Sequence, residues 1–332
     1  MRTLIAFVAL ICAAGIASAQ ERLIVDGAYV QDAARRGAIL WDVRSADDYK
    51  KGHLPGAINI GDIARVLRDD NAEDFIATEK IEKILGAAGI DPAREIIAYG
   101  GRGTWNPYFG QFTMQYFGAR QTRVYHDGID GWAAAGHPLS REEAKIAAVA
   151  LKLQVNPAVS VSTREVVARL NKSGTQIIDV RTPKEYAGED IRAIRGGHIP
   201  GAVNIPYEQN WVDPATPQKL ARREVRDSSG MSLKPVEQLK ALYSRLDPEK
   251  ETIVYCQSGA RASETAGVLQ QLGFKNVKVY DSSWLGYGNT LDAPADNVSF
   301  FNVGLLNGRI ASMQGRIDQL ERELAETKAA RK

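Results

Sequence analysis

The stretch TIVYCQSGARASETAGVLQQLGF, residues 252–274, joins a strand pattern to a helix pattern through a single cysteine. Four residues typical of strands lead into Cys256, a Ser-Gly turn and Arg261, and an amphipathic helix pattern follows. Strands that alternate with helices in this way form parallel sheets covered by helices. In such sheets the ligand site lies at the carboxyl ends of the strands, where Cys256 stands. The stretch therefore predicts an α/β fold with Cys256 at its site.

The chain contains an internal repeat. WDVRSADDYKKGHLPGAINI (41–60) and IDVRTPKEYAGEDIRAIRGGHIPGAVNIP (178–206) share Asp-Val-Arg and then Gly-His-x-Pro-Gly-Ala-x-Asn-Ile. Further on, EIIAYGGRG aligns with TIVYCQSGA, so that Gly100 takes the position of Cys256. A repeat of whole strand-and-helix units indicates a duplicated domain. We therefore expect two α/β domains, each a parallel sheet flanked by helices, with the thiol only in the second.

Length and composition support two domains. The chain has 332 residues, of which 44% are hydrophobic and 25% charged, as in globular proteins with two cores. A change from charged to apolar residues before Asn156-Pro157 indicates a linker. The expected order is a signal peptide at 1–19, a first domain at 23–139, a linker at 140–160, a second domain at 161–296 and a C-terminal heptad helix at 303–332.

The first residues are typical of a secretory signal peptide. A basic residue precedes an apolar run at 4–16, and Ala-Ser-Ala follows at 17–19. The run is shorter than the roughly 18 to 20 residues that span a bilayer, so we expect cleavage, no membrane attachment afterwards, and a periplasmic or secreted protein. Cleavage removes Cys12 and leaves Cys256 as the only cysteine. A single thiol in an oxidising compartment is either buried and inert or used in chemistry.

The overall charge does not call for nucleic acid as a partner. With 42 basic and 40 acidic residues the formal net charge is only +2. A strongly basic balance would favour nucleic acid or an anionic membrane, and this chain lacks one. A small molecule or another protein is the expected partner.

The last thirty residues carry a heptad pattern with charged residues between the apolar positions. The pattern predicts a helix that associates with a second copy into a homo-oligomer. The alternative is an amphipathic helix packed on its own domain, and Gly308 and Gly315 each cost such a helix about 1 kcal/mol. The seam is formed by Val303, Leu306, Ile310, Met313, Ile317, Leu320, Leu324 and Thr327.

The residues after Cys256 predict an anion-binding loop. Successive amides in a tight turn, together with the positive end of a helix, favour a thiolate that acts as a nucleophile. Gly259 suits the positive φ that such a turn needs, and Ser258 and Arg261 add a donor and a positive charge. The spacing is C-x4-R, one residue smaller than the C-x5-R ring of phosphatases, so a persulfide fits better than phosphate. Phosphate hydrolysis or arsenate reduction is the minor alternative. The expected anion-binding residues are Gln257, Ser258, Gly259, Ala260 and Arg261.

Together these motifs resemble the rhodanese-like sulfurtransferases, of the tandem type in which an N-terminal copy without the cysteine supports a catalytic C-terminal copy. The resemblance covers about residues 23–296 and includes VYDSSWLGYG (279–288), which is similar to the closing motif of the catalytic domain. It implies that Cys256 takes sulfur from thiosulfate or 3-mercaptopyruvate as a persulfide and passes it to cyanide or a thiol, without a cofactor. The alternative is a persulfide carrier or relay protein whose acceptor is a protein.

Two departures from the family pattern leave the donor open. The loop CQSGAR is neither the Cys-Arg-Lys-Gly form typical of thiosulfate enzymes nor the Cys-Gly-Ser-Gly form typical of mercaptopyruvate enzymes. The arginine with which tandem enzymes grip the substrate would fall at Glu185. Arg192 and Arg195, in an insert at 188–196, are the candidates to replace it, and a solvated basic loop is the alternative.

Other polar residues of the repeat are expected to have structural roles. His53 and His198 lie in matching turns, and their presence in the copy without a cysteine argues against catalysis. Asp179 and Arg181 are repeated in the same way, so we expect a structural pair beneath the loop. The histidines show no ligand spacing, and no metal is predicted.

Overall fold

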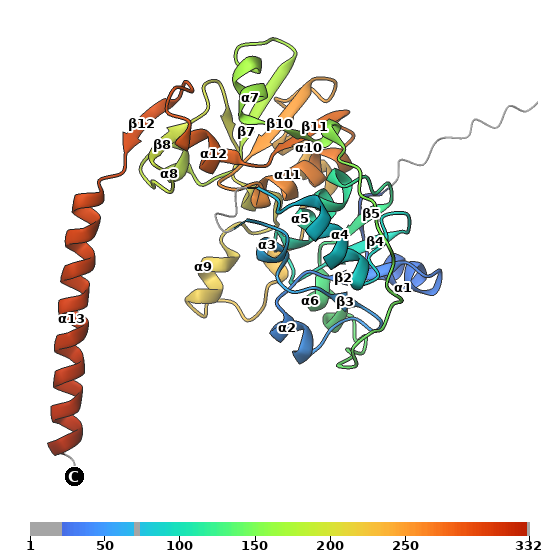
Figure 1. Ribbon diagram of the computed structural model, residues 1–332, viewed down its shortest axis with the longest axis horizontal. Helices are drawn as coiled ribbons and strands as arrows, with labels where there is room; N and C mark the ends of the chain where they lie inside the picture. Colours follow the sequence, from blue (N-terminus) through green and yellow to red (C-terminus); the bar gives the residue numbers. More distant parts are fainter. Residues whose placement is uncertain (1–21, 70–73, 331–332) are drawn as a thin grey trace, which may run out of the picture.

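The computed structural model describes residues 22–69 and 74–330, which form two α/β domains and a long C-terminal helix (Figure 1). The segment expected to be a signal peptide, residues 1–19, lies outside the described residues. Among the helices that are described, none is long and apolar enough to cross a bilayer.

Strands and helices alternate in both domains. The elements of the first domain are β1 (Ile24–Val25), α1 (Gly27–Arg35), β2 (Ile39–Asp42), α2 (Ala46–Lys51), β3 (Ile58–Asn59), α3 (Ile63–Val66), α4 (Thr78–Ala87), β4 (Ile96–Tyr99), α5 (Asn106–Tyr116), β5 (Thr122–Tyr125) and α6 (Gly128–Ala134). Those that follow are η1 (Pro157–Val159), β6 (Ser160–Val161), α7 (Thr163–Arg169), β7 (Thr175–Asp179), α8 (Pro183–Tyr186), β8 (Arg195–His198), β9 (Val203–Asn204), η2 (Tyr207–Asn210), α9 (Thr216–Ala221), η3 (Ser229–Met231), α10 (Val236–Leu242), β10 (Glu251–Tyr255), α11 (Ala260–Gln271), β11 (Asn276–Tyr280), α12 (Ser283–Asn289), β12 (Asp296–Phe300) and α13 (Val303–Ala330).

Each domain is built on a five-stranded parallel sheet, and the two sheets have the same strand order. The order is β1-β5-β4-β2-β3 in the first domain and β6-β11-β10-β7-β9 in the second. The registers agree as well, because Tyr99 lies opposite Asp42 just as Tyr255 lies opposite Asp179. This equivalence confirms the predicted α/β fold and the duplication.

Local sequence signals explain where the elements form. All four residues of β4 are buried, and so are the last four of β10, as expected for strands covered on both faces. A capping box opens α7: the Ser162 hydroxyl accepts from the Glu165 amide, and the Glu165 carboxylate accepts from the Ser162 amide. The same arrangement at Thr182 and Glu185 opens α8.

The two domains pack against each other through α5 and α11 (Figure 1). A Cβ atom at Gly267 of α11 would lie 2.7 Å from the Tyr108 ring of α5, so a glycine is needed at this crossing. One hydrophobic cluster includes buried residues of both helices, among them Phe109 and Ala266. The carboxyl end of β10 therefore opens toward the first domain.

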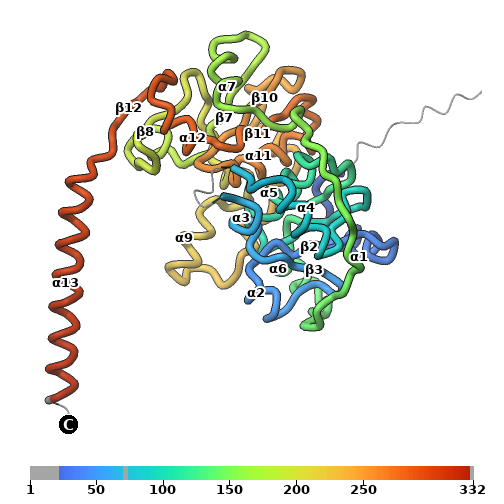
Figure 2. The backbone as a smooth tube through the Cα atoms, in the orientation of Figure 1, coloured from blue at the N-terminus to red at the C-terminus, as the bar shows by residue number. Residues whose placement is uncertain are grey.

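Residues 141–156, here called the strap, contain neither helix nor strand and run along the first domain past α4 (Figure 2). The Val149 amide donates to the Gly86 carbonyl at 2.9 Å, and the Leu153 amide donates to the Glu82 carboxylate at 2.8 Å. A Cβ atom at Gly86 would lie 2.4 Å from the Val149 carbonyl oxygen, so the strap requires a glycine there. Most of the predicted linker is thus fixed to the first domain.

The insert predicted at 188–196 contributes to a small antiparallel sheet. Its end forms part of β8, which pairs with β12 through Arg195 opposite Phe300 and His198 opposite Asp296. The Phe301 amide then donates to the Ile194 carbonyl at 3.1 Å. This sheet holds the chain just before α13, which extends away from both domains (Figure 1).

Candidate active site

Cys256 lies directly after β10, at the carboxyl end of the central strand of its sheet. Only 1% of the surface of Cys256 is exposed. The loop from 256 to 261, here called the cysteine loop, turns into α11 through Gly259, whose φ is +79°. A Cβ atom at Gly259 would lie 2.5 Å from the Asp281 Oδ1 atom. The position therefore needs glycine both for its backbone conformation and for space.

Ser283 fixes the conformation of the cysteine loop. Its Oγ accepts hydrogen bonds from the amides of Cys256 and Gly259, both at 3.0 Å, and donates to the Tyr280 carbonyl at 2.7 Å. The Cys256 Sγ atom lies 4.0 Å from the same Oγ. Because a hydroxyl has one proton and Tyr280 receives it, Ser283 orders the loop rather than donating to the sulfur.

Part of the predicted anion-binding set remains available. The Gly259 amide is occupied by Ser283, so it is not a donor to a ligand in this conformation. Within the described ranges, the amides of Gln257, Ser258, Ala260 and Arg261 have no hydrogen-bond acceptor. These four amides, at the N-terminal end of a twelve-residue helix, can receive an anion attached to Cys256.

A cavity of about 320 Å³ lies in front of Cys256, between the two domains. Its second-domain lining includes Tyr207 and Glu208 of η2, together with Cys256 and its loop. The first domain supplies the remaining walls. They consist of Ala64, Arg68, Trp105 and Phe109.

Glu185 connects the two arginines that line this cavity on the second-domain side. Its carboxylate accepts two hydrogen bonds from Arg261, both at 2.8 Å, and one from Arg192 at 3.2 Å. The side chain of Glu185 is 1% exposed. Burial alone would raise the pKa of this carboxyl, but the hydrogen bonds and charge of Arg261, together with the Thr182 amide, lower it to about 2. Glu185 is therefore an anion at neutral pH, and it orients Arg261 and Arg192.

The two candidate arginines of the insert lie in different places. Arg192 lines the cavity with its side chain half exposed, and its carbonyl accepts from the Gln257 side chain at 2.7 Å. Arg195 does not line the cavity. Its buried guanidinium donates to the carbonyls of Thr290 and Ala293 at 2.9 and 2.8 Å, so its role is to hold the end of α12.

An ion pair joins the domains beside the cysteine loop. The Arg68 guanidinium lies 2.6 Å from the Asp281 carboxylate, and it stacks over the rings of Phe75 and Phe109. The second oxygen of Asp281 has no hydrogen-bond partner in the part of the chain that the structure describes. Burial raises the pKa of Asp281 to about 6 despite the charge of Arg68.

The charges around the cavity are balanced. Arg68, Arg192 and Arg261 line it, but Arg68 is paired with Asp281 and the other two with Glu185. Glu208 lines the cavity as well, and burial raises the pKa of its carboxyl although Arg261 opposes this. The site therefore offers directed hydrogen-bond donors rather than a large net positive charge.

Comparison with known proteins identifies the family. A family model described as "Rhodanese-like domain" matches residues 27–135 and 162–290. The chain belongs to the rhodanese-like family. Its two rhodanese-like domains coincide with the two sheets of the duplication.

Three proteins illustrate this likeness. The thiosulfate sulfurtransferase of Corynebacterium glutamicum is 34% identical over 260 residues, which cover 75% of this chain and 81% of that protein. The sulfur carrier protein TtuD of Thermus thermophilus is 30% identical, covering 74% of this chain and 86% of that protein. The structure of the 3-mercaptopyruvate sulfotransferase SseA of Escherichia coli matches with a TM-score of 0.65 at 22% identity, covering 79% of this chain and 98% of that chain.

In the first rhodanese-like domain, Gly100 occupies the position equivalent to Cys256 and has a scaffold role. The Gly100 carbonyl accepts from the Ile129 amide at 2.9 Å, as the Cys256 carbonyl accepts from the Trp284 amide at 3.0 Å. A Cβ atom at Gly100 would lie 3.1 Å from the Thr104 hydroxyl. The backbone of the duplicated loop is thus retained without a thiol, and a side chain at this position would be tightly packed against Thr104.

The repeated polar residues have the structural roles that the sequence predicts. Arg181 donates to both oxygens of Asp179, at 2.6 to 3.1 Å, and both side chains are buried. His198 stacks on Tyr186 and its Nδ1 lies 2.9 Å from the Tyr186 carbonyl, as His53 does with Tyr49. Within the described ranges, no three histidine, cysteine or carboxylate side chains form a group that could hold a metal ion.

Sequence reasoning missed the cavity walls and the loop anchor. Arg68, Trp105 and Phe109 belong to the first domain and lie outside the repeated motifs, so no sequence signal assigned them to the site. Ser283 lies inside VYDSSWLGYG, which was recognised as a motif without a role for its second serine. Its φ of +50°, rare for a residue with a side chain, is the structural sign of that role.

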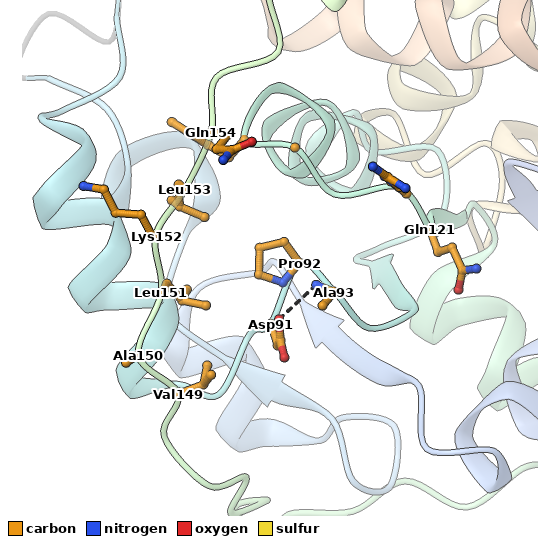
Figure 3. A pocket seen from close by; sticks show the side chains of 13 residues that line it. Asp91, Pro92, Ala93, Gln121, Val149, Ala150, Leu151, Lys152, Leu153 and Gln154 are labelled. Carbon is orange, nitrogen blue, oxygen red and sulfur yellow. Dashed lines mark hydrogen bonds between the residues drawn. The ribbon is translucent and has the colours of Figure 1, made fainter.

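A larger cavity of about 640 Å³ lies elsewhere, beneath the strap (Figure 3). It is bounded by Val149–Gln154 of the strap and by the turn that contains Asp91 and Pro92. The Asp91 side chain accepts from the Ala93 amide at 2.9 Å and so closes that turn. The lining contains no cysteine or histidine and none of the repeated motif residues, so we assign the site to the smaller cavity at Cys256.

Proposed function

We propose that this chain is a sulfurtransferase that moves a sulfane sulfur from a small donor, thiosulfate or 3-mercaptopyruvate, to a thiophilic acceptor such as cyanide or a thiol. The observation that carries the proposal is the position of Cys256, the one cysteine within residues 22–69 and 74–330, directly after β10 and among four available amides at the N-terminal end of α11. The name of the Corynebacterium relative, a thiosulfate sulfurtransferase, supports the same reaction type.

The proposed reaction has two steps. In the first, the Cys256 thiolate attacks the outer sulfur of the donor; a bond forms between Sγ and that sulfur, and the bond to the donor breaks. With thiosulfate, the electron pair leaves with sulfite. In the second step the acceptor attacks the outer sulfur of the persulfide, and the electron pair of the S–S bond returns to Sγ; cyanide leaves as thiocyanate. This is covalent catalysis in two half-reactions.

The loop amides have a defined role in this scheme. The outer persulfide sulfur carries a negative charge that the amides of Gln257, Ser258, Ala260 and Arg261 can stabilise by hydrogen bonds without reorganising. Both terminal nitrogens of the Arg261 guanidinium donate to the Glu185 carboxylate, so that guanidinium is already occupied. We therefore assign the half-exposed guanidinium of Arg192 to the anionic end of the donor.

The deciding experiment is the intact mass of the protein before and after incubation with each donor, followed by cyanide. We expect a gain of one sulfur atom that cyanide removes, and no gain in Cys256→Ser. The donor that loads the protein at lower concentration identifies the substrate. Sulfur loading that persists in Cys256→Ser would reject the mechanism. The unfolding midpoint of Cys256→Ser should match that of the natural chain if the serine only removes the nucleophile.

A second candidate is a persulfide carrier with a protein acceptor, favoured by the name of the Thermus relative, a sulfur carrier protein. Both functions share the persulfide and differ in the acceptor. A carrier loads with sulfur but turns over slowly with cyanide or small thiols. If a partner docks on the C-terminal segment, removal of the residues after 302 should slow transfer to that protein and leave transfer to cyanide unchanged.

Export to the periplasm or out of the cell is a further proposal, and it rests on the signal pattern of residues 1–19. Expression in a Gram-negative host tests it. The expected result is a chain in the periplasmic fraction whose N-terminal residue is Gln20. A chain of full length in the cytoplasm would reject it.

A further inference from the structure

The C-terminal helix α13 has an apolar face that nothing within the described ranges covers. None of the residues 303–329 is buried, and the seven apolar residues of its seam are 38% to 66% exposed. The hydrogen bonds of α13 run inside the helix or to Asn302. The packing on its own domain that the sequence left open as an alternative is not found. A helix of this kind in water gains most of its stability from packing of its apolar face.

The order of side chains along the seam indicates what covers it. In heptad positions, a is occupied by Val303, Ile310, Ile317 and Leu324, and d by Leu306, Met313, Leu320 and Thr327. β-Branched residues at a, present at three of these four positions, together with leucine at d, present at two of the four, favour two parallel strands over trimers or tetramers. The glycines of the helix fall at outer positions, with Gly308 and Gly315 both at f, so the seam itself is uninterrupted.

The charges beside the seam are complementary in the same arrangement. In a parallel pair each g residue faces the e residue of the next heptad on the other helix. Arg316 then faces the partner's Glu321, and Glu323 faces the partner's Lys328. In an antiparallel pair with full overlap, by contrast, Arg316 would face the partner's Arg316, and the opposite-charge pairs between g positions would be limited to Arg309 with Glu323. Charge complementarity therefore favours a second copy of the same helix as the partner, in parallel orientation.

A membrane surface fits this helix less well. Helices that lie on anionic bilayers are rich in lysine and arginine on their polar face. Between 303 and 330 the helix carries four basic residues, at 309, 316, 322 and 328, and four acidic ones, at 318, 321, 323 and 326, which leaves no net charge.

We propose that α13 forms a parallel two-stranded coiled coil with α13 of a second copy of this chain. The helix has 28 residues and is about 42 Å long, which provides the three to four heptads that such a seam needs. The small sheet of β8 and β12 fixes the start of each helix, so both catalytic bodies lie at the same end of the coiled coil.

The mass of the full chain in solution, measured by sedimentation or light scattering across a dilution series, tests the proposal. We expect a dimer, and at least a hundredfold weaker dimerisation in Ile317→Asp, which places a charge in the seam. Ser312→Asp adds the same charge to the outer face of the same helix and should remain dimeric. A monomer at all concentrations, a trimer or tetramer, or a dimer unaffected by Ile317→Asp would overturn the proposal. So would binding of α13 to anionic vesicles by a chain that is monomeric in solution.

The parallel direction of the two α13 helices is tested separately. Arg316→Glu should weaken the dimer about tenfold, because it sets two glutamates against each other at two sites, and Arg316→Glu with Glu321→Arg should restore it. In a background with Cys12→Ser and Cys256→Ser, Leu306→Cys should form a disulfide between copies on oxidation, whereas Leu305→Cys, outside the seam, should not. Failure of Leu306→Cys to cross-link a dimer would overturn the parallel arrangement.

Discussion

Ser283 illustrates how one side chain determines the shape of the cysteine loop. Its hydroxyl is the acceptor for two buried loop amides, and it is held in turn by the Tyr280 carbonyl. The hydroxyl occupies the amides of Cys256 and Gly259, and the other four amides of the loop remain for a ligand. The serine is therefore a positioning residue, which acts on sulfur transfer through the loop.

We expect Ser283→Ala to lower the free energy of unfolding by about 2 kcal/mol or more, since each buried amide left without an acceptor costs about 1 to 3 kcal/mol. Denaturant unfolding measures this. Ser263→Ala is the matched control: the Gly259 carbonyl loses the Ser263 hydroxyl but keeps the Ser263 amide at 3.0 Å. Equal losses in the two variants would contradict the role given to Ser283.

The lowered pKa of Glu185 makes the free energy of unfolding depend on pH through this single group. Its pKa is lowered from 4.5 to about 2 in the folded protein, so the folded state binds its proton more weakly than the unfolded state does. The resulting stabilisation is complete above pH 4.5 and is lost as the pH falls toward 2. Its full size is about 3 kcal/mol.

Glu185→Gln should therefore be less stable than the natural chain at pH 7, and this difference should shrink toward pH 2. Glu165→Gln provides the comparison, because Glu165 occupies the same place in a capping box but has no buried arginine pair. Unfolding curves at a series of pH values distinguish them. A Glu185→Gln difference that is constant with pH would show that the ion pair is not its cause.

At the scale of elements, the unit of β10, the cysteine loop and α11 depends on close approach to the start of α12. Gly259 has a positive φ, and any Cβ atom there would meet both Asp281 Oδ1 at 2.5 Å and the Asp281 carbonyl oxygen at 2.8 Å. Gly201 has nearly the same φ, +76°, but nothing lies within 4 Å of its Cβ position. Comparing substitutions at Gly259 and Gly201 therefore separates the cost of backbone strain from the cost of a steric clash.

Gly259→Ala should cost at least 1 kcal/mol more than Gly201→Ala, because only the first combines strain with a clash. It should also slow sulfur loading, as the loop must move away from α12. Denaturant unfolding and the time course of the mass gain measure the two effects. Similar losses in the two variants would mean that the loop is free to shift.

The strands and helices could be predicted from the sequence because their signals are local. Buried apolar runs mark β7 and β10, and the capping box marks the start of α7. Boundaries differ slightly: the strand pattern of residues 252–255 corresponds to β10, Glu251–Tyr255. The repeat also predicted that the two domains share one topology, because two copies of one strand-and-helix pattern form two equivalent sheets.

The walls of the site could not be predicted, because they depend on contacts between distant residues. Arg68 and Asp281 are 213 positions apart, and neither has a charge pattern around it that indicates the other. The roles of Arg192 and Arg195 could not be separated either. Both lie in one basic insert, and only the fold turns Arg192 to the cavity and Arg195 to the carbonyls at the end of α12.

At the scale of the whole molecule, the Arg68–Asp281 pair fastens the two domains beside the cavity. Removing one partner of a buried ion pair costs about 3 to 5 kcal/mol because the other charge stays buried. Arg68→Met, which keeps much of the packing over Phe75 and Phe109, should therefore destabilise the chain by that amount at pH 7.5. The loss should be smaller at pH 5, where Asp281, with a pKa of about 6, takes up a proton.

Two controls accompany this prediction. Arg123→Met removes an arginine that pairs with Glu95 at 2.7 Å and stacks on Tyr29 within the first domain, and its effect should be smaller because that pair is more exposed. Asp281→Asn added to Arg68→Met should recover part of the lost stability. If it recovers none, the uncompensated charge is not the reason for the loss.

The origin of the cavity walls has one more consequence. The Cys256 sulfur belongs to one copy of the duplicated domain, while Ala64, Trp105 and Phe109 belong to the other. Substitutions at these three positions can alter the size and polarity of the chamber without touching the strand, turn or helix that present the sulfur. Under the proposed function, part of the chamber can therefore change in one half of the gene while the strand, loop and helix that present Cys256 are encoded in the other.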